Sequence, residues 1–311
     1  MGRRNRRGRD VTGVFILDKP RGITSNAALQ RLKYLYQAKK AGHTGSLDRL
    51  ASGLLPICFG EATKLSGYLL DADKRYETRL TLGATTTTGD EEGEIKVRRE
   101  VGDYSAAQLE AVLERFRGPI EQIPPMHSAL KQNGKRLYKL AHRGIEVPRE
   151  ARPVTIRELS VTQRGDGWLM LDVLCTKGTY IRTLGEDIGE ALGCGAHVST
   201  LRRTQAGPFD ASNMHTLDDV EALLAEGPEA LDQMLRPLGE ALPGWPSVRL
   251  SGDLIHYLRQ GQPVLVPRAP TSGWVRMDDS EGQLVGLGEV QDDGKIAPRR
   301  LIGAATSAVI E

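Results

Sequence analysis

The stretch AGHTGSLDRLASGLLPICF, residues 41–59, joins a glycine-rich loop to an apolar run. Residues 54–59 (LLPICF) are apolar and stop at Gly60, a pattern that predicts a short buried strand. The loop before it, residues 41–53, carries three glycines, hydroxyl side chains, His43 and Asp48, and such a loop can bring backbone N–H groups close to a ligand. A plainer alternative is a turn in which Asp48 bonds its own backbone and His43 has no special task.

Regular elements are predicted on both sides of this loop. Residues 13–18 form an apolar run that Pro20 and Gly22 stop, which predicts a buried strand. From Ser25 the apolar residues recur at helical spacing and leave a basic face exposed. Further helices are predicted at about 61–70, 105–117 and 178–192, and further strands at about 75–83, 154–163 and 167–175.

The sequence 242–246 (LPGWP) predicts a domain boundary, because its two prolines and its glycine resist regular structure. Short strand-like segments separated by turns follow it, as expected of a small β barrel. Residues 124–153 open with Pro124-Pro125 and predict an exposed basic insertion. A length of 311 residues agrees with about two domains.

Several classes of protein are excluded or disfavoured. No window has the ~18 uninterrupted apolar residues of a membrane helix, and the run at 14–17 is too short for a signal peptide. The three cysteines lie far apart, without a C-x-x-C pair, which argues against disulfides and zinc. P-loop, dinucleotide-binding, H-E-x-x-H and G-x-S-x-G signatures are absent. We therefore expect a cytoplasmic protein without a metal or a nucleotide cofactor.

Charge is segregated along the chain, although the net charge is only +2. Residues 1–80 hold 16 basic and 7 acidic side chains, residues 127–157 hold 8 and 2, and residues 211–311 hold 8 and 15. Basic blocks in a nearly neutral chain are typical of a surface that binds a polyanion, above all nucleic acid. The alternative is a solvated face together with a disordered basic tail at residues 1–10.

A second unusual segment is CTKGTYIRTLGED, residues 175–187, in which Tyr180 and Arg182 leave a turn just before a helix. Taken alone, it is more simply a helix start with an exposed arginine. Tyr76, in RYETRLTL, is by itself a strand tyrosine with its hydroxyl at the rim.

Together these segments resemble a known family. GHTGSLDRLASGLLPICFGEATK, then DKRY, then CTKGTYIRTLGEDIGEALGCGAHVSTLRRTQAG closely resemble the TruB family of bacterial tRNA pseudouridine synthases. The similarity runs from GVFILDKPRGITS to the terminal APRRL and covers nearly the whole chain.

The resemblance implies an α+β fold. Residues 11–245 would form a catalytic domain with a central, mostly antiparallel mixed sheet flanked by helices, and residues 124–153 its thumb-like insertion. Residues 246–311 would form a small PUA-like β-barrel domain that binds RNA.

The resemblance also implies a reaction. The chain would convert uridine 55 in the T loop of tRNA to pseudouridine after flipping the base, without a cofactor. By motif position Asp48 is the catalytic aspartate, acting either as a nucleophile on the sugar or as a base at the 2′ carbon. Arg182 would hold Asp48 ionised through a two-bond pair in a partly dry pocket, and Tyr76 would stack on the uracil and help remove the C5 proton.

Further residues are implied to contact the substrate. His43 would insert among the T-loop bases, and Tyr180 and Leu201 would lie beside the target base. Phosphate contacts are expected from Lys19, Lys64, Lys131, Lys135 and Arg136. The expected partner is the T stem-loop of tRNA, bound by a monomer. An alternative of another class is a tRNA-folding or RNA-binding protein in which catalysis is secondary.

Overall fold

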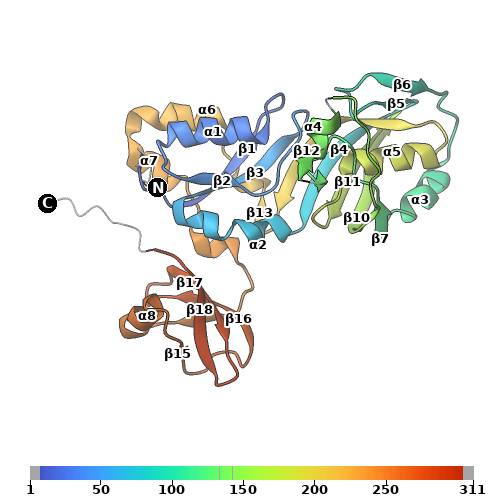
Figure 1. Cartoon of the computed structure of the whole chain (residues 1–311). Coiled ribbons are helices and arrows are strands. Elements are labelled where there is room, and N and C mark those ends of the chain that lie inside the picture. Colours follow the sequence, from blue (N-terminus) through green and yellow to red (C-terminus); the bar gives the residue numbers. More distant parts are fainter. Residues whose placement is uncertain (1–7, 133, 142, 304–311) are drawn as a thin grey trace.

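The computed structural model describes residues 8–132, 134–141 and 143–303, which form two domains built on separate sheets (Figure 1). The large sheet has the strand order β1-β3-β12-β4-β11-β10-β7, with β2 paired to β3 and β13 paired to β12. Its described pairs are antiparallel except β12 with β3, so the predicted mixed, mostly antiparallel sheet is confirmed. Its strands are β1 (Gly13–Lys19), β2 (Ala41–His43), β3 (Ser52–Phe59), β4 (Lys74–Leu82), β7 (Gly118–Gln122), β10 (Arg152–Gly165), β11 (Trp168–Cys175), β12 (Ala196–Ala206) and β13 (Phe209–Asp210).

Helices cover the large sheet at its two ends (Figure 1). α1, α6 and α7 lie beside β1 and β2, and α3 and α5 lie at the opposite end. Thr24 caps α1 by accepting a hydrogen bond from the Ala27 N–H, which explains why that helix begins at Ser25. The helices are α1 (Ser25–Leu35), α2 (Ser66–Asp71), α3 (Ala106–Glu114), α4 (Leu137–Ala141), α5 (Ile181–Ala191), α6 (Leu217–Ala222), α7 (Pro228–Gln233) and α8 (Gly252–Arg259). Single 3-10 turns lie at Gly60–Lys64, Ala211–Asn213, Leu223–Glu226 and Leu238–Ala241.

Strand β1 shows how the sheet separates two hydrophobic cores. Phe15 and Leu17 pack into the main core with α1, whereas Val14 and Ile16 point to the other face. Successive side chains of a strand alternate between faces, so a run that is apolar at every position must be covered on both. The second core includes Leu287 and Ile302 from the C-terminal domain and therefore joins the two domains.

The C-terminal domain is a five-stranded sheet in the order β14-β16-β17-β18-β15, with α8 beside it. Tyr68, Trp245 and Trp274 meet edge to face at the junction, with ring centroids 5.1–6.4 Å apart. Lys64 donates to the Glu61 carboxylate and to the Leu301 carbonyl, and thereby ties the domains together. The strands are β14 (Ser247–Arg249), β15 (Val264–Leu265), β16 (Gly273–Asp278), β17 (Leu284–Val290) and β18 (Lys295–Leu301).

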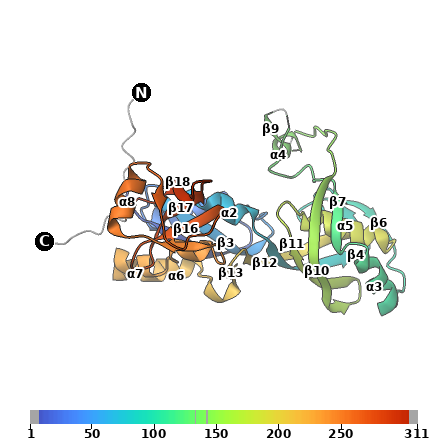
Figure 2. The same ribbon diagram turned by 90° about the horizontal axis from the view of Figure 1, so that it is seen from below.

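The segment between β7 and β10 projects from the body of the molecule (Figure 2). It contains a short hairpin of β8 (Lys131–Gln132) and β9 (Lys135–Arg136), followed by α4. A second small hairpin consists of β5 (Ala84–Thr86) and β6 (Ile95–Arg98). We call residues 124–151 the insertion hereafter.

Two expectations about the N-terminal half need correction. Residues 8–10, assigned above to a disordered tail, contact the body, because the Arg9 N–H donates to Gln37 and the Arg9 guanidinium pairs with Asp232. Residues 1–7 lie outside the described residues. The helix expected at 61–70 is a 3-10 turn followed by the short α2.

Candidate active site

A cleft of about 1320 Å³ crosses the middle of the large sheet. It exceeds the usual few hundred to ~1000 Å³ of a small-molecule pocket, so it suits a part of a larger substrate. Its walls come from the 44–49 loop, α2, β4, the insertion, α5 and β12. Seven of the residues singled out from the sequence line it: His43, Asp48, Tyr76, Lys131, Arg136, Tyr180 and Arg182.

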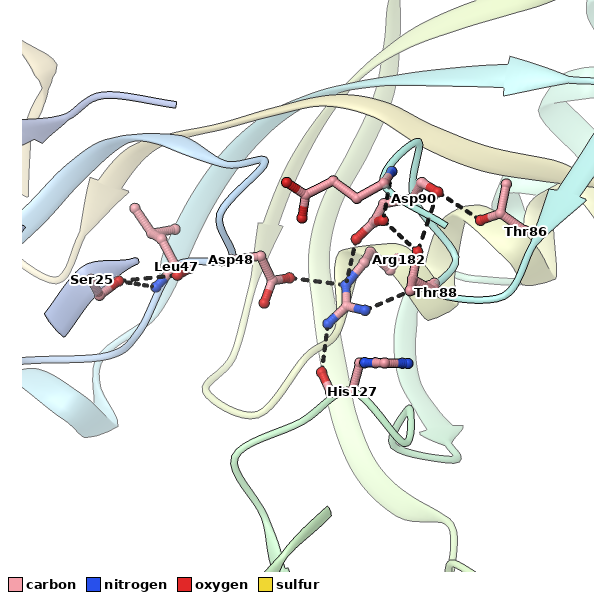
Figure 3. Close-up of polar contacts among 9 residues, drawn as sticks. Ser25, Leu47, Asp48, Thr86, Thr88, Asp90, His127 and Arg182 are labelled. Atoms are coloured by element: carbon pink, nitrogen blue, oxygen red, sulfur yellow. Dashed lines mark hydrogen bonds and ion pairs between the residues drawn. The ribbon is translucent and has the colours of Figure 1, made fainter. Parts of the chain in front are cut away.

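The loop that carries Asp48 is fixed on both sides of that residue. Leu47 and Leu50 are buried in the main core. The Ser25 hydroxyl, at the start of α1, accepts from the Leu47 N–H at 2.7 Å and donates to the Leu47 carbonyl at 3.1 Å (Figure 3). Asp48 is left projecting into the cleft with 44% of its side chain exposed. The pocket is less dry at Asp48 than expected, because the buried neighbours anchor the loop and leave the aspartate itself exposed.

Arg182, in the first turn of α5, is 5% exposed and reaches four groups (Figure 3). Its Nε lies 2.9 Å from Asp48 Oδ2 and 3.6 Å from Asp90 Oδ2. Its Nη1 donates to the Thr88 carbonyl at 2.7 Å and its Nη2 to the His127 carbonyl at 2.9 Å. The expected two-bond pair with Asp48 is wrong, since both terminal nitrogens bind main-chain carbonyls. The guanidinium is thus held in place independently of Asp48.

Asp90 is a site residue that the sequence analysis missed. It is 3% exposed, accepts from the Thr88 hydroxyl through Oδ1 and from the Glu92 N–H, and faces Arg182 through Oδ2. The only sequence signal was an aspartate that ends the polar run TTTTGD, a composition that is more often a simple turn.

Two tyrosines line the cleft. Tyr76 lies on β4, and burial raises the pKa of its phenol, an effect that the Arg203 guanidinium opposes. Tyr180 precedes α5, where its N–H donates to the Gln122 side chain at 2.9 Å. Burial likewise raises the pKa of Tyr180. Both rings are half-buried, as expected of side chains that combine packing with a polar tip in the cleft.

His43 ends β2 at the edge of the same cleft. Burial, helped by the nearby Arg203 charge, lowers the pKa of its imidazole, so the ring is neutral near pH 7. Its Nδ1 is buried and has no hydrogen-bond partner in the described structure. A neutral, half-buried ring at a cleft edge is suited to stacking.

Arg203, on β12, is a second lining residue that the sequence analysis missed. It is 1% exposed and donates from Nε to the Leu54 carbonyl at 2.7 Å and from Nη2 to the Gly45 carbonyl at 3.1 Å. The sequence did not indicate its burial, because an arginine in LRRT is normally expected to be exposed.

The other residues expected to touch substrate lie elsewhere. Lys19 does not form part of a phosphate-binding surface, because it is fully buried and donates to the Pro20 and Ile23 carbonyls. Lys64 lies at the domain junction, where it donates to the Leu301 carbonyl. Leu201, 7% exposed, packs in the main core and is not among the lining residues. Lys131, Lys135 and Arg136 are exposed on the insertion.

Within the described residues, no three His, Cys, Asp or Glu side chains gather as a metal site. None of the helices there is long and apolar enough to cross a membrane. The three cysteines are buried and unpaired.

Comparisons with known proteins agree along the chain. Residues 33–181 match the model of the TruB family pseudouridylate synthase N-terminal domain, residues 182–243 the tRNA pseudouridylate synthase B C-terminal domain, and residues 246–302 the C-terminal domain of pseudouridine synthase II TruB. A tRNA pseudouridine synthase B from Nitrosococcus oceani is 56% identical, over 95% of this chain and 96% of the relative. One from Ectopseudomonas mendocina is 58% identical, over 94% and 96%.

The fold is also found among solved structures. A chain of a Cbf5-Nop10-Gar1 complex superposes with a TM-score of 0.73 at 27% identity, over 94% of this chain and 85% of that one. The family models and the relatives at more than 50% identity carry the assignment. The chain belongs to the TruB family of pseudouridine synthases and is an isomerase.

Proposed function

We propose that the chain isomerises uridine 55 in the T loop of tRNA to pseudouridine, with Asp48 as the catalytic carboxylate. The observation that carries this proposal is the ion pair between Arg182 and Asp48, set in a cleft that Tyr76 and Tyr180 also line. Pseudouridine formation detaches uracil from C1′ of the ribose, rotates it and rejoins it through C5, so the leaving base becomes the nucleophile. The reaction is redox-neutral, and one carboxylate suffices where a conventional glycosidase needs two.

The geometry leaves two routes for Asp48. It either attacks C1′ as a nucleophile or removes a proton from C2′ to give a glycal-like intermediate. Both routes need an oriented carboxylate, which the ion pair with Arg182 supplies. A deuterium at C2′ separates them, because only C2′ deprotonation breaks that bond and gives a primary isotope effect.

Access to Asp48 requires that the uridine leave its stack, at a cost of a few kcal/mol. The neutral ring of His43, at the cleft edge, is placed to fill the space that the flipped base vacates. The exposed cations of the insertion, Lys131, Lys135 and Arg136, are suited to T-stem phosphates. These features favour the T stem-loop as the recognised part of tRNA, bound by one copy of the chain.

The test is tritium release from tRNA transcripts labelled at uridine C5, together with filter binding. The wild type should release tritium from a normal transcript but not from one with cytidine at position 55. Asp48→Asn should bind as tightly and release none, whereas Asp103→Asn, an exposed control outside the cleft, should behave as wild type. If the wild type binds without release, a tRNA-folding role or another RNA substrate is the better account.

Tyr76→Phe belongs to the same experiment. We expect it to bind tRNA and to turn over poorly, because it keeps the stacking ring and loses the hydroxyl. Normal turnover would restrict Tyr76 to stacking.

A further inference from the structure

Arg203 has an environment that its place in a strand does not explain. It is among the largest fully buried side chains of the protein and lies on the central strand β12, between β3 and β4. Its assigned acceptors are the main-chain carbonyls of Leu54 and Gly45. No carboxylate in the described part of the chain forms an ion pair with it, in contrast to Arg182, which has two. Burying a cation without a counter-charge is expensive, so this one calls for a functional explanation.

Arg203 lies directly opposite Tyr76 in the large sheet. Arg203 and Tyr76 are register partners across the antiparallel pair of β12 and β4, and both line the cleft. Directly opposed residues of such a pair have their side chains on one face, within contact distance. The two side chains therefore share one wall of the cleft.

The other charged or titratable groups around Tyr76 do not favour its ionisation. Burial and the Asp48 carboxylate both raise the pKa of the Tyr76 phenol, and Arg203 is the group that lowers it. Cys175 also lies nearby, but burial raises the pKa of its thiol to about 11, so it stays neutral. Lys74, on the same strand, donates to the Leu70 and Ala72 carbonyls at the end of α2.

We infer that Arg203 is a positioning residue that acts through Tyr76: its fixed positive charge favours the phenolate of Tyr76, the form that accepts the C5 proton of the rejoined base. The inference rests on the proposed function, in which Tyr76 removes that proton. It adds a role for a residue that does not itself need to touch the substrate.

The proton step balances without a further reactant. Once C5 is bonded to C1′, it still carries its hydrogen, and the ring has a C6=N1 double bond. Tyr76 phenolate takes the proton from C5, the C5–H electron pair forms C5=C6, and the C6=N1 pair moves to N1, which takes up a proton. The net change is the transfer of one proton from C5 to N1.

The test is the pH dependence of single-turnover tritium release from C5-labelled tRNA, from about pH 6 to about pH 10. In this range the phenolate fraction of a phenol with a raised pKa increases with pH, so the rate has a rising limb. Arg203→Gln removes the charge and keeps a donor for the carbonyls; Arg203→Lys keeps the charge. In Arg203→Gln, we expect the rising limb of the pH–rate profile to move to higher pH by about one unit, so that the rate near pH 7 falls about 10-fold. In Arg203→Lys, the limb should stay in place. Thermal unfolding and filter binding check that each variant folds and binds.

Two controls separate this role from a structural one. Lys74→Met removes another buried cation of the cleft and should lower stability without moving the limb. In a Tyr76→Phe background, Arg203→Gln should cause no further loss. An equal fractional loss at every pH, or the same limb in both Arg203 variants, would overturn the inference.

Failure of the inference can be told from failure of the proposed function. If Tyr76→Phe releases tritium normally, the proton role of Tyr76 is wrong and the inference falls with it. If Tyr76→Phe is inactive and Arg203→Gln keeps the wild-type limb, only the role of Arg203 is wrong. If Arg203→Gln does not fold, a shifted limb in the folded Arg203→Lys protein overturns the inference and an unshifted limb supports it.

Discussion

The floor of the cleft and the insertion place their cations in opposite surroundings. On the floor, Arg182 is 5% exposed and held by two carbonyls and two carboxylates. On the insertion, Lys131, Lys135 and Arg136 are exposed, and none has a carboxylate partner among the described residues. Charges fixed before substrate arrives need no reorganisation during the reaction, whereas exposed charges can contact a phosphate backbone. Changes on the floor should therefore alter the rate, and changes on the insertion should alter affinity.

After Asp48 itself, the largest effect is expected from Arg182→Lys. A lysine presents one ammonium and cannot bridge Thr88, His127 and the two carboxylates at once. We expect the single-turnover rate to fall by at least about 100-fold and the free energy of unfolding to fall by about 3 kcal/mol, because Asp90 stays buried without its partner. Tritium release and urea unfolding measure the two changes.

Arg202→Lys is the matched control for this prediction. Arg202 lies next to Arg203 on β12 and makes a two-bond pair with Asp18, at 3.0 and 2.7 Å, away from the cleft lining. The single-turnover rate of Arg202→Lys should change by less than about 3-fold, because an exposed ion pair contributes little free energy. If Arg182→Lys retains more than about a tenth of the rate, the fixed floor is not what orients Asp48.

A smaller effect is expected from Asp90→Asn, which keeps the shape of the side chain and removes its charge. The amide can no longer attract the Arg182 Nε, although Thr88 can still hold the loop. We expect about a 10- to 100-fold loss of rate with unchanged tRNA binding, because a small displacement of Arg182 misplaces Asp48. A wild-type rate in a folded Asp90→Asn protein would make Asp90 purely structural.

The strands of the large sheet differ in how well the sequence predicted them. The apolar runs at 13–18 and 54–59 and the approximate alternation at 75–83 were predicted as strands and are β1, β3 and β4, because uniform or largely alternating patterns indicate burial directly. β12 was not predicted, although it is central. Bulges near Ser199 and Thr204 interrupt its alternation, and one of its buried positions is filled by Arg203.

The site shows the same limit. Single residues within long motifs, such as Asp48, Tyr76 and Arg182, were found by resemblance and lie in one cleft. Their partners were not found, because the carbonyls of Thr88 and His127 carry no side-chain signature and Asp90 reaches Arg182 through tertiary folding alone. Lys19 was wrongly taken as exposed because composition does not distinguish a buried lysine from a solvated one.

An intermediate effect is expected at His43, which lies between floor and insertion at the cleft edge. His43→Ala should lower the rate by about 10-fold by removing the ring that stacks in the space left by the flipped base, and His43→Phe should restore most of the rate.

His43 should also affect how stability depends on pH. Because burial lowers the pKa of His43, the folded state resists protonation of the ring. The stability that the neutral ring contributes to the protein is present above pH 6.5 and is lost as pH falls. His43→Phe should remove that part of the acid dependence, measured by urea unfolding at several pH values. Without rescue by Phe, hydrogen bonding or acid–base work becomes the better explanation.

The smallest effect is expected on the insertion. Lys131→Ala and Arg136→Ala each remove one exposed cation that faces the cleft, and each should weaken tRNA binding by a few-fold and reduce the slope of log affinity against log salt by about one. The single-turnover rate at saturating protein should not change, because neither side chain touches the Arg182 network. Lys295→Ala, on the C-terminal sheet and paired with Asp293, is the control and should leave the salt slope as it is. A loss of the saturated rate in either insertion variant would mean that the insertion does more than hold phosphates, and since the His127 carbonyl binds Arg182, it would indicate that insertion and floor move as one unit.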